Sequence, residues 1–168
     1  KYLTEKTQRL WKFEGLGHYG SDKLQRVERL KDFIPPVCGI HNGFMESAWI
    51  EGTQAKEPDG DLLDTVADYL ARLKQECSVG EIADTALLAE VIRVNTGDEV
   101  RDPRFEVEAV AIDGRMQLHE WLRTTRGWVK TDALDHHNDH LLPGNQDIAW
   151  DVAGAAVEFG VSPETIAD

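Results

Sequence analysis

Cysteine and long apolar segments are both scarce in this sequence. Its 168 residues include only two cysteines, Cys38 and Cys77, which form no CxxC pair and are too few for a disulfide framework. No apolar run approaches the ~18 residues that a membrane-spanning helix needs, and no signal-peptide pattern opens the sequence. The sequence therefore predicts a cytoplasmic protein that keeps its thiols reduced and does not enter a membrane.

Positive charge is also in short supply. Eighteen Lys and Arg stand against thirty-one Asp and Glu, which leaves a formal net charge of −13. Nucleic-acid binding draws its affinity from Lys and Arg that neutralise phosphates, so no nucleic-acid partner is expected. An anionic membrane surface is disfavoured for the same reason. The summed field favours a cationic substrate or partner, and the sequence does not define an oligomeric state.

The composition is that of a folded protein, with 41% apolar and 29% charged residues. The first part of the chain alternates between extended and helical patterns. Residues 9–13, "RLWKF", predict a strand, and Ser21 is a suitable N-cap for a helix that ends near Asp32. The pair Asn42-Gly43 between two extended runs predicts a hairpin. Residues 51–60 form a polar linker.

The second part is predicted to be mainly helical. Apolar residues between Leu62 and Leu73 follow a helical period, and Ser78 with Glu81 forms a capping-box pattern that predicts a second helix. Asn145 is the expected N-cap of a last helix. Three short strands are predicted between these helices, at residues 104–112, 118–124 and 128–134.

This order of elements predicts an α+β protein with two lobes. Residues 1–52 would form a small β-containing lobe with one helix, and residues 53–168 a mainly helical lobe.

Three glycines, Gly15, Gly17 and Gly20, match the dinucleotide-binding pattern G-x-G-x-x-G. In that fold, the glycines let backbone amides approach a pyrophosphate at a helix N-terminus. The βαβ unit that the pattern requires does not follow, because the next extended segments form a hairpin. A flexible connector is therefore the favoured interpretation.

Two aspartates flank the predicted hairpin at residues 118–134. Asp113 lies in a loop before it and Asp132 at the end of its second strand, which places the two carboxylates near one point. One could act as a catalytic base while the other holds magnesium. The alternative is that Asp113-Gly114 is only a turn, for which Asp-Gly is a preferred pair. The residues alone leave both interpretations open.

Lys12 on the first strand and Glu28 on the following helix form a pattern that kinases use to hold ATP phosphates. Taken alone, these two residues favour the simpler interpretation, in which both side chains face solvent.

Three histidines, His136, His137 and His140, fall within five residues of one another. On a helix, pairs with this spacing would share a face and could bind zinc. Their neighbours Pro143 and Gly144 indicate a loop, and no cysteine or distant histidine completes four ligands. A solvated loop is favoured over a zinc module.

Several segments, taken in order, resemble the aminoglycoside phosphotransferase and choline kinase family, which has a protein-kinase-like fold. "LWKF" and the helix with "LQRVERL" are similar to the family's third strand and its glutamate-bearing helix. "FMESAWIEG" resembles the strand and hinge, and "DLLDTVADYLARL" the first helix of the large lobe. "DGRMQLHEWLRTTRGWVKTDALD" resembles the catalytic loop, hairpin and metal-binding Asp, and "GNQDIAWDVAGA" the helix that anchors the site.

The resemblance implies a role for each matching residue. Lys12 would contact the phosphates of ATP and Glu28 would orient it. Asp113 would be the catalytic base and Asp132 would hold Mg²⁺. Asp147 would be a structural anchor at the start of its helix.

The sequence departs from the family pattern H-x-D-x-x-x-x-N at two positions. Ala111 stands where the histidine falls, and Leu118 where the asparagine falls; His119 is the nearest polar substitute as a metal ligand. Imidazole is a poorer magnesium ligand than an oxygen group. The family's first nucleotide-covering hairpin is missing and Lys1 replaces an initiating Met, which indicates a fragment or a reduced member.

The function expected from the resemblance is Mg-ATP-dependent phosphoryl transfer to a hydroxyl of a small, cationic molecule. The alternative is a kinase-like binding or scaffold domain without turnover, which the two departures favour.

Overall fold

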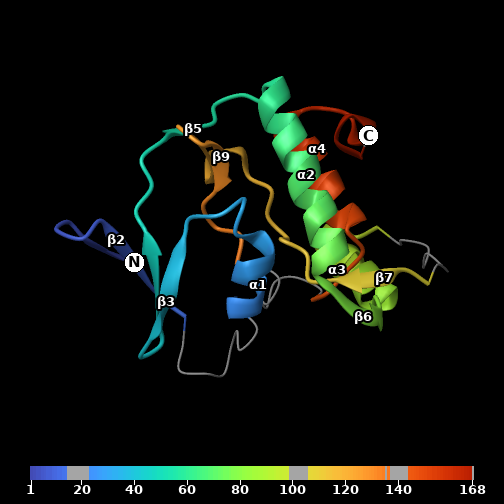
Figure 1. The fold of residues 1–168 in the computed structure, drawn as a ribbon. Coiled ribbons are helices and arrows are strands. Elements are labelled where there is room, and N and C mark those ends of the chain that lie inside the picture. The colour runs from blue at the N-terminus through green and yellow to red at the C-terminus, as the bar shows by residue number, and fades with distance from the viewer. Residues whose placement is uncertain (15–22, 99–105, 135, 137–143, 168) are drawn as a thin grey trace.

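The computed structural model describes residues 1–14, 23–98, 106–134, 136 and 144–167. In these residues the chain combines helices with antiparallel sheets, so the predicted α+β class is confirmed. Figure 1 shows the first sheet on one side of the molecule and helices α2 to α5 on the other, with helix α1 between them. No helix of the described residues is both long and apolar enough to cross a membrane.

The first sheet has four antiparallel strands in the order β1-β2-β4-β3. Their bounds are Tyr2–Thr4 (β1), Arg9–Phe13 (β2), Val37–His41 (β3) and Phe44–Ala48 (β4). The predicted hairpin is confirmed: Asn42 and Gly43 both have positive φ, as a type I′ turn requires, and His41 pairs with Phe44. Helix α1, Lys23–Leu30, lies between β2 and β3 in the sequence.

Helix α2, Gly60–Glu76, supplies the centre of the core. Asp59 caps it by accepting a hydrogen bond from the Leu62 backbone N–H at 2.8 Å. The buried face is the predicted stripe, and its central residue, Tyr69, packs edge-to-face on Trp121 with ring centroids 5.6 Å apart. Both rings are fully buried, so α2 and strand β8 share one apolar core.

A small sheet in the order β5-β8-β9 lies at the edge of this core. It joins Thr53–Gln54 (β5), Trp121–Thr124 (β8) and Gly127–Lys130 (β9), and a short 3-10 helix, Leu118–Glu120 (η1), precedes β8. Gly52, just before β5, is required by packing, because a Cβ there would lie 2.8 Å from the Arg123 carbonyl oxygen. Helices α4, Ala149–Phe159, and α5, Pro163–Ala167, complete the helical side.

The second helix is present, but its start predicted from Ser78 and Glu81 is wrong. Residues Ser78–Ile82 form strand β6, which pairs with β7, Glu108–Val110, and the Ser78 hydroxyl donates a hydrogen bond to the Glu108 carboxylate instead of capping a helix. Gly80 has a φ of +71°, which is incompatible with a helix. Helix α3, Thr85–Thr96, begins later, with Asp84 as its cap.

The start of the last helix also differs from the prediction. Asn145 does not cap it. Gln146 instead forms an isolated bridge with Val110, and helix α4 begins at Ala149. Asp147 accepts a hydrogen bond from the Ala149 backbone N–H at 3.0 Å, so it stabilises the first turn locally, at the helix start where an anchor was expected.

Candidate functional site

Asp113 lies at the centre of a buried polar network, in the loop that follows β7. Only 1% of the residue is exposed. Its Oδ2 accepts a hydrogen bond from the Tyr69 hydroxyl at 2.5 Å and lies 3.1 Å from Lys130 Nζ. Its Oδ1 lies 3.4 Å from His136 Nδ1. Three side chains from separate parts of the chain therefore hold one carboxylate.

Asp151 fixes the backbone beneath this carboxylate. It lies in the first turn of α4, is fully buried, and accepts hydrogen bonds from the backbone N–H groups of Asp113 at 2.7 Å and Gly114 at 2.8 Å. The loop anchor is thus Asp151, four residues beyond Asp147. An acidic residue in line with buried Ala155 and Phe159 was the sequence signal that could have identified it.

The pKa values of the two buried carboxyl groups, Asp113 and Asp151, are shifted in opposite directions. Burial alone would raise the pKa of Asp113, but the charge of Lys130 and the hydrogen bonds from His136 and Tyr69 lower it to about 2. Burial, followed by repulsion from Asp113, raises the pKa of Asp151 to about 7 in spite of its two backbone hydrogen bonds. Below neutral pH the negative charge of this pair therefore resides on Asp113.

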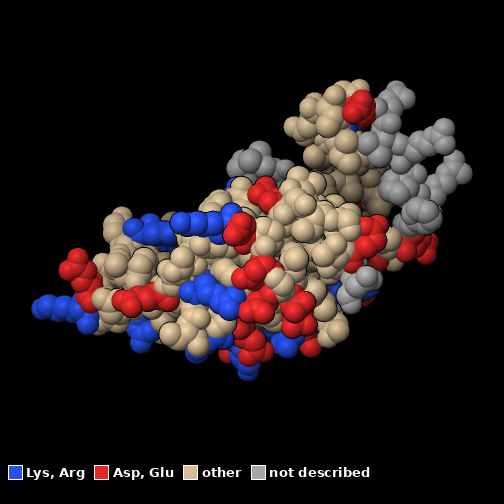
Figure 2. Space-filling view, turned by 90° about the horizontal axis from the view of Figure 1, so that it is seen from above, with Lys and Arg blue, Asp and Glu red and all other residues tan. Residues whose placement is uncertain are grey.

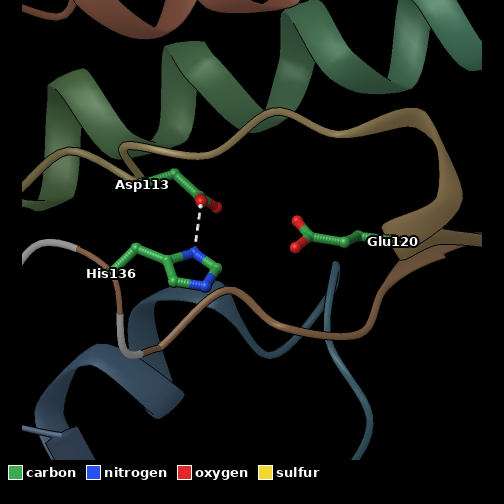
Figure 3. A group of neighbouring side chains, drawn as sticks. All are labelled: Asp113, Glu120 and His136. Atoms are coloured by element: carbon green, nitrogen blue, oxygen red, sulfur yellow. Dashed lines mark hydrogen bonds and ion pairs between the residues drawn. The ribbon is translucent and has the colours of Figure 1, made fainter. Parts of the chain in front are cut away.

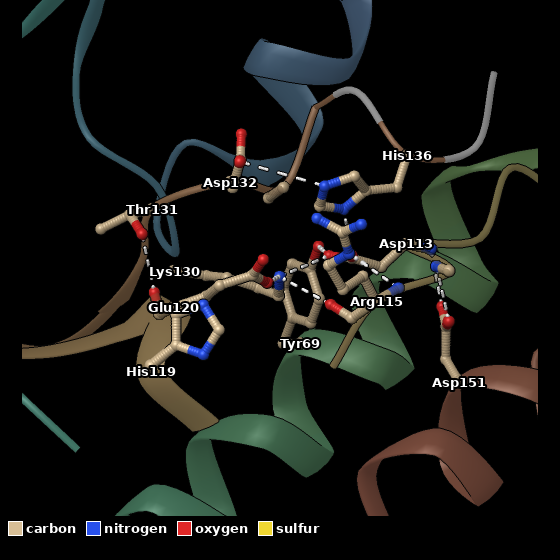
Figure 4. A network of polar contacts seen from close by, with 12 residues as sticks. Tyr69, Asp113, Arg115, His119, Glu120, Lys130, Thr131, Asp132, His136 and Asp151 are labelled. Carbon is tan, nitrogen blue, oxygen red and sulfur yellow. Dashed lines mark hydrogen bonds and ion pairs between the residues drawn. The ribbon is translucent and has the colours of Figure 1, made fainter. Parts of the chain in front are cut away.

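Lys130, the last residue of β9, is fully buried and joins three segments of the site. Besides Asp113, its Nζ contacts Glu120 Oε2 at 2.7 Å and the Arg115 carbonyl oxygen at 3.0 Å (Figure 4). Burial lowers the pKa of Lys130, but the charges of Asp113 and Glu120 outweigh it and the net shift is upward. Lys130 is therefore a charged ammonium within the protein interior.

His136 links this buried network to an accessible one. Its Nε2 lies 3.9 Å from Asp132 Oδ2, and Asp132 Oδ1 accepts a hydrogen bond from Lys12 Nζ at 2.9 Å. Burial raises the pKa of Asp132, but the hydrogen bond and charge of Lys12 dominate and lower it. About a quarter of the Asp132 side chain is exposed, so this carboxylate is accessible to a ligand.

Arg26, on the inner face of α1, connects that helix to both aspartate-bearing segments. Its buried guanidinium donates hydrogen bonds to the carbonyl oxygens of Ala111 at 2.5 Å, Ile112 at 3.2 Å and Ala133 at 3.0 Å. The first two carbonyls precede Asp113 and the third follows Asp132. One side chain therefore fixes the spacing of the two segments.

A pocket of about 830 Å³ is lined in part by Thr131, the residue that precedes Asp132 in the sequence. Its wall is the chain between β4 and β5, residues 48–52, together with Leu10, Leu122 and Thr131. Lys1 also lines it and lies 3.6 Å from Asp132 Oδ2. The pocket thus lies at the connection between the two sheets. Lys1 and Thr131 link its wall to Asp132, which does not itself line it.

The structure brings together three of the five residues predicted for the site: Lys12, Asp113 and Asp132. Glu28 lies elsewhere: its side chain is 76% exposed and its carboxylate is 3.7 Å from Lys31 Nζ. Besides Asp132, Lys12 Nζ lies 3.9 Å from the carboxylate of Glu14, which also pairs with Lys23. Helix α1 therefore turns Glu28 away from Lys12 and presents Arg26 to the site.

His119 is likewise not among the grouped side chains. It is exposed, and its backbone carbonyl accepts a hydrogen bond from Gln54 Nε2 at 3.1 Å. The next residue, Glu120, turns inward instead. Within the described residues, the ligand atoms of Asp113, Glu120 and His136 all lie within 4.8 Å of one another, close enough to share a metal ion (Figure 3).

Two further predictions fall on segments outside the described residues. These are the glycine pattern at Gly15, Gly17 and Gly20 and two of the three clustered histidines, His137 and His140.

The Mg²⁺ ion implied by the resemblance needs accessible oxygen ligands, of which the protein commonly supplies one or two while phosphates and water supply the rest. The partly exposed carboxylate of Asp132 fits that requirement. Asp113 is buried and already held by three side chains, so it is the poorer candidate.

Comparison with protein-family models and with curated protein sequences finds no match to this chain. The chemistry that the site can perform is therefore inferred from its own residues.

Proposed function

We propose that this protein is a Mg-ATP-dependent phosphotransferase with a two-lobed, protein-kinase-like fold, acting on a hydroxyl of a small molecule. The observation that carries the proposal is the Lys12–Asp132 pair, with Nζ and Oδ1 2.9 Å apart. Thr131, which precedes Asp132 in the sequence, lines the 830 Å³ pocket. A strand lysine next to a carboxylate that can hold Mg²⁺ is the arrangement that positions ATP phosphates in kinases.

The pocket offers a place for the nucleotide base. Residues 48–52 would present backbone groups to its edge, and Leu10 and Leu122 would provide apolar contacts on its faces. The triphosphate would extend toward Lys12 and Asp132. Bound Mg²⁺ would supply neutralisation of the developing phosphate charge, with Asp132 as its protein ligand.

Asp113 would orient the acceptor hydroxyl and take its proton as the oxygen attacks the γ-phosphorus and ADP leaves. A carboxylate with a pKa near 2 is a weak base, but phosphoryl transfer relies mostly on positioning and charge neutralisation. The proton acceptor therefore needs a fixed geometry more than a high basicity, and Asp151 and Arg26 supply that geometry.

The charge distribution favours a cationic acceptor. Residues 1–52 contain eight Lys and Arg and seven Asp and Glu, whereas residues 53–168 contain ten and twenty-four. On the face in Figure 2, blue side chains lie mostly toward the end formed by the first sheet, mixed with red ones, and red side chains are more frequent than blue over the rest of the view. A positively charged small molecule would be attracted to the acidic part.

A kinase-like binding domain without turnover is the second candidate. The observation that favours it is the occupation of Asp113: the carboxylate is buried and already bound by Tyr69, Lys130 and His136. Under this alternative the nucleotide binds, but no acceptor reaches Asp113.

Thermal unfolding with and without Mg-ATP tests the nucleotide site. A ligand at ~100 times its Kd stabilises a protein by about 2.7 kcal/mol. We expect a magnesium-dependent increase in Tm for the wild type, its loss in Asp132→Ala, and its retention in Asp64→Ala, which removes an exposed carboxylate on α2. No increase in the wild type would contradict both candidates.

Turnover then separates the two candidates. ADP release should be measured with a panel of cationic hydroxyl compounds for the wild type and for Asp113→Asn. Loss of turnover in Asp113→Asn, with the Mg-ATP shift retained, supports the transferase. Nucleotide binding by the wild type without turnover on any acceptor supports the binding domain.

A further inference from the structure

The ammonium of Lys130 is surrounded by three acceptors. Its Nζ lies 2.7 Å from Glu120 Oε2, 3.1 Å from Asp113 Oδ2 and 3.0 Å from the Arg115 carbonyl oxygen. An ammonium has three donors, and here each finds one oxygen. The side chain is fully buried, so these contacts take the place of water.

The same two carboxylates belong to the cluster with metal-binding geometry. The ligand atoms of Asp113, Glu120 and His136 lie within 4.8 Å of one another, and each comes from a different segment of the chain. Two carboxylates and one imidazole form a donor set suitable for a divalent transition metal. Lys130 Nζ contacts both carboxylates of this set, so lysine and metal compete for one position.

We propose that Lys130 is the resident cation of this cluster: its ammonium occupies the position between Asp113 and Glu120 that a divalent metal would otherwise fill. The wild-type cluster is then closed to metal. Removal of the lysine side chain converts it into a metal site with Asp113, Glu120 and His136 as ligands.

Charge and burial both support this exchange. Two buried, ionised carboxylates without a cation are strongly unfavourable, so this cluster needs either a positive charge or a proton on a carboxyl group. A metal entering the wild type would push a buried ammonium away from all three of its oxygens at once. In a variant without the ammonium, a divalent ion meets the same requirement with the same oxygens.

The inference goes beyond the proposed function and does not depend on it, because it concerns the cluster without nucleotide or acceptor. It also bears on the reaction. If Lys130 is the cation at Asp113, the Mg²⁺ of a transferase would be held at Asp132 and not at Asp113, and Lys130 would be a positioning residue for Asp113.

The test uses Co²⁺, whose visible absorption reports nitrogen and oxygen ligation, on the full chain. Four proteins are compared: wild type, Glu120→Gln, Lys130→Ser and the double variant Lys130→Ser/Glu120→Gln. The serine leaves room for an ion, and the double variant removes one charge of each sign. Because Lys130→Ser leaves two carboxylates unpaired, it is refolded both with Co²⁺ and with a chelator, and folding is followed by circular dichroism.

We expect indistinguishable Co²⁺ titrations for the wild type and Glu120→Gln. Lys130→Ser should bind one additional Co²⁺ at least tenfold more tightly than the double variant. A Co²⁺ spectrum of the wild type that Glu120→Gln abolishes would overturn the proposal, since the native cluster would then hold metal. Lys130→Ser that binds no Glu120-dependent Co²⁺, or that fails to fold even with Co²⁺, would overturn it as well. None of these results depends on whether the protein binds ATP.

Discussion

The carboxylate of Asp151 holds the backbone of Asp113, accepting its N–H at 2.7 Å and that of Gly114 at 2.8 Å. The first turn of α4 thereby determines where the loop places its own carboxylate. The proximity of the two acidic side chains is electrostatically unfavourable, and the two backbone hydrogen bonds to Asp151 offset this repulsion.

Replacing Asp151 should therefore separate the hydrogen-bonding role from the charge. We expect Asp151→Ala to lower the free energy of unfolding by roughly 2–5 kcal/mol, because it leaves two buried N–H groups without an acceptor. Asp113 N–H and Gly114 N–H donate to different oxygens of Asp151, so Asp151→Asn keeps an acceptor for only one of them. Because it also removes the repulsion with Asp113, it should cost less than Asp151→Ala. Urea unfolding of both variants measures the difference. An Asn variant as unstable as the Ala variant would contradict this expectation and show that one acceptor oxygen is not enough to hold the loop.

The raised pKa of Asp151 predicts a pH dependence with a defined sign. Its folded-state pKa of about 7 exceeds the usual ~4 of an unfolded Asp, so the folded state binds more protons between these values. This contribution is fully present below pH ~4 and is lost as the pH rises toward 7. Unfolding free energies of the wild type and Asp151→Asn at several pH values between 4 and 8 should diverge accordingly, with the wild type losing more stability as pH rises. Parallel curves would contradict the assignment.

Arg26 should be critical to the spacing of the two aspartate segments. Arg26→Met leaves the carbonyls of Ala111, Ile112 and Ala133 without their donor and should cost roughly 2–4 kcal/mol. Arg26→Lys keeps the charge but not the planar guanidinium, so its free energy of unfolding should lie between those of the wild type and Arg26→Met. Lys31→Met, at an exposed position of the same region, is the control and should stay within about 0.5 kcal/mol of wild type. Chemical unfolding compares the three variants, and an Arg26→Met protein as stable as the control would refute the role.

Local patterns explain which parts of the fold could be predicted. The stripe on α2 and the Asn42-Gly43 turn are encoded by neighbouring residues, and both are confirmed. The capping box at Ser78 failed because a local signal competed with pairing to β7, 30 residues away. The spacing of residues in the sequence contains information on local structure but not on which distant strands pair.

The candidate site divides in the same way. Asp113 and Asp132 flank one hairpin, so their proximity follows from chain order, and His136 joins them. The partners that bury Asp113 come from distant segments: Tyr69 lies in the apolar stripe of α2 and Lys130 in a strand pattern. In the sequence, Tyr69 therefore resembles any aromatic residue of a core and Lys130 any lysine of a strand. Only the folded structure shows that both contact Asp113.

The Tyr69 hydroxyl should contribute to the charge state of Asp113 as well as to stability. Tyr69→Phe retains the ring that packs on Trp121 but removes the 2.5 Å hydrogen bond to the carboxylate. We expect a loss of about 1.5–3 kcal/mol, the range for hydrogen bonds to charged groups, and an upward shift of the Asp113 pKa. Urea unfolding measures the loss of stability, and NMR titration of the Asp113 carboxyl carbon measures the pKa shift. An unchanged Asp113 pKa in the variant would show that the Tyr69 hydroxyl does not stabilise the ionised carboxylate.

Lys12 should matter for nucleotide and little for folding. Its pair with Asp132 is about a quarter exposed on both sides, and ion pairs of that kind contribute about 0–1 kcal/mol. Lys12→Met should therefore unfold within about 1 kcal/mol of wild type in the absence of ligand. The proposed phosphate contact predicts that the same variant loses most of the Mg-ATP-dependent increase in Tm, while Lys6→Met, at an exposed position, retains it. An undiminished increase in Lys12→Met would place the phosphates away from strand β2, and the Lys12–Asp132 pair would then be only a surface ion pair between a strand and a loop.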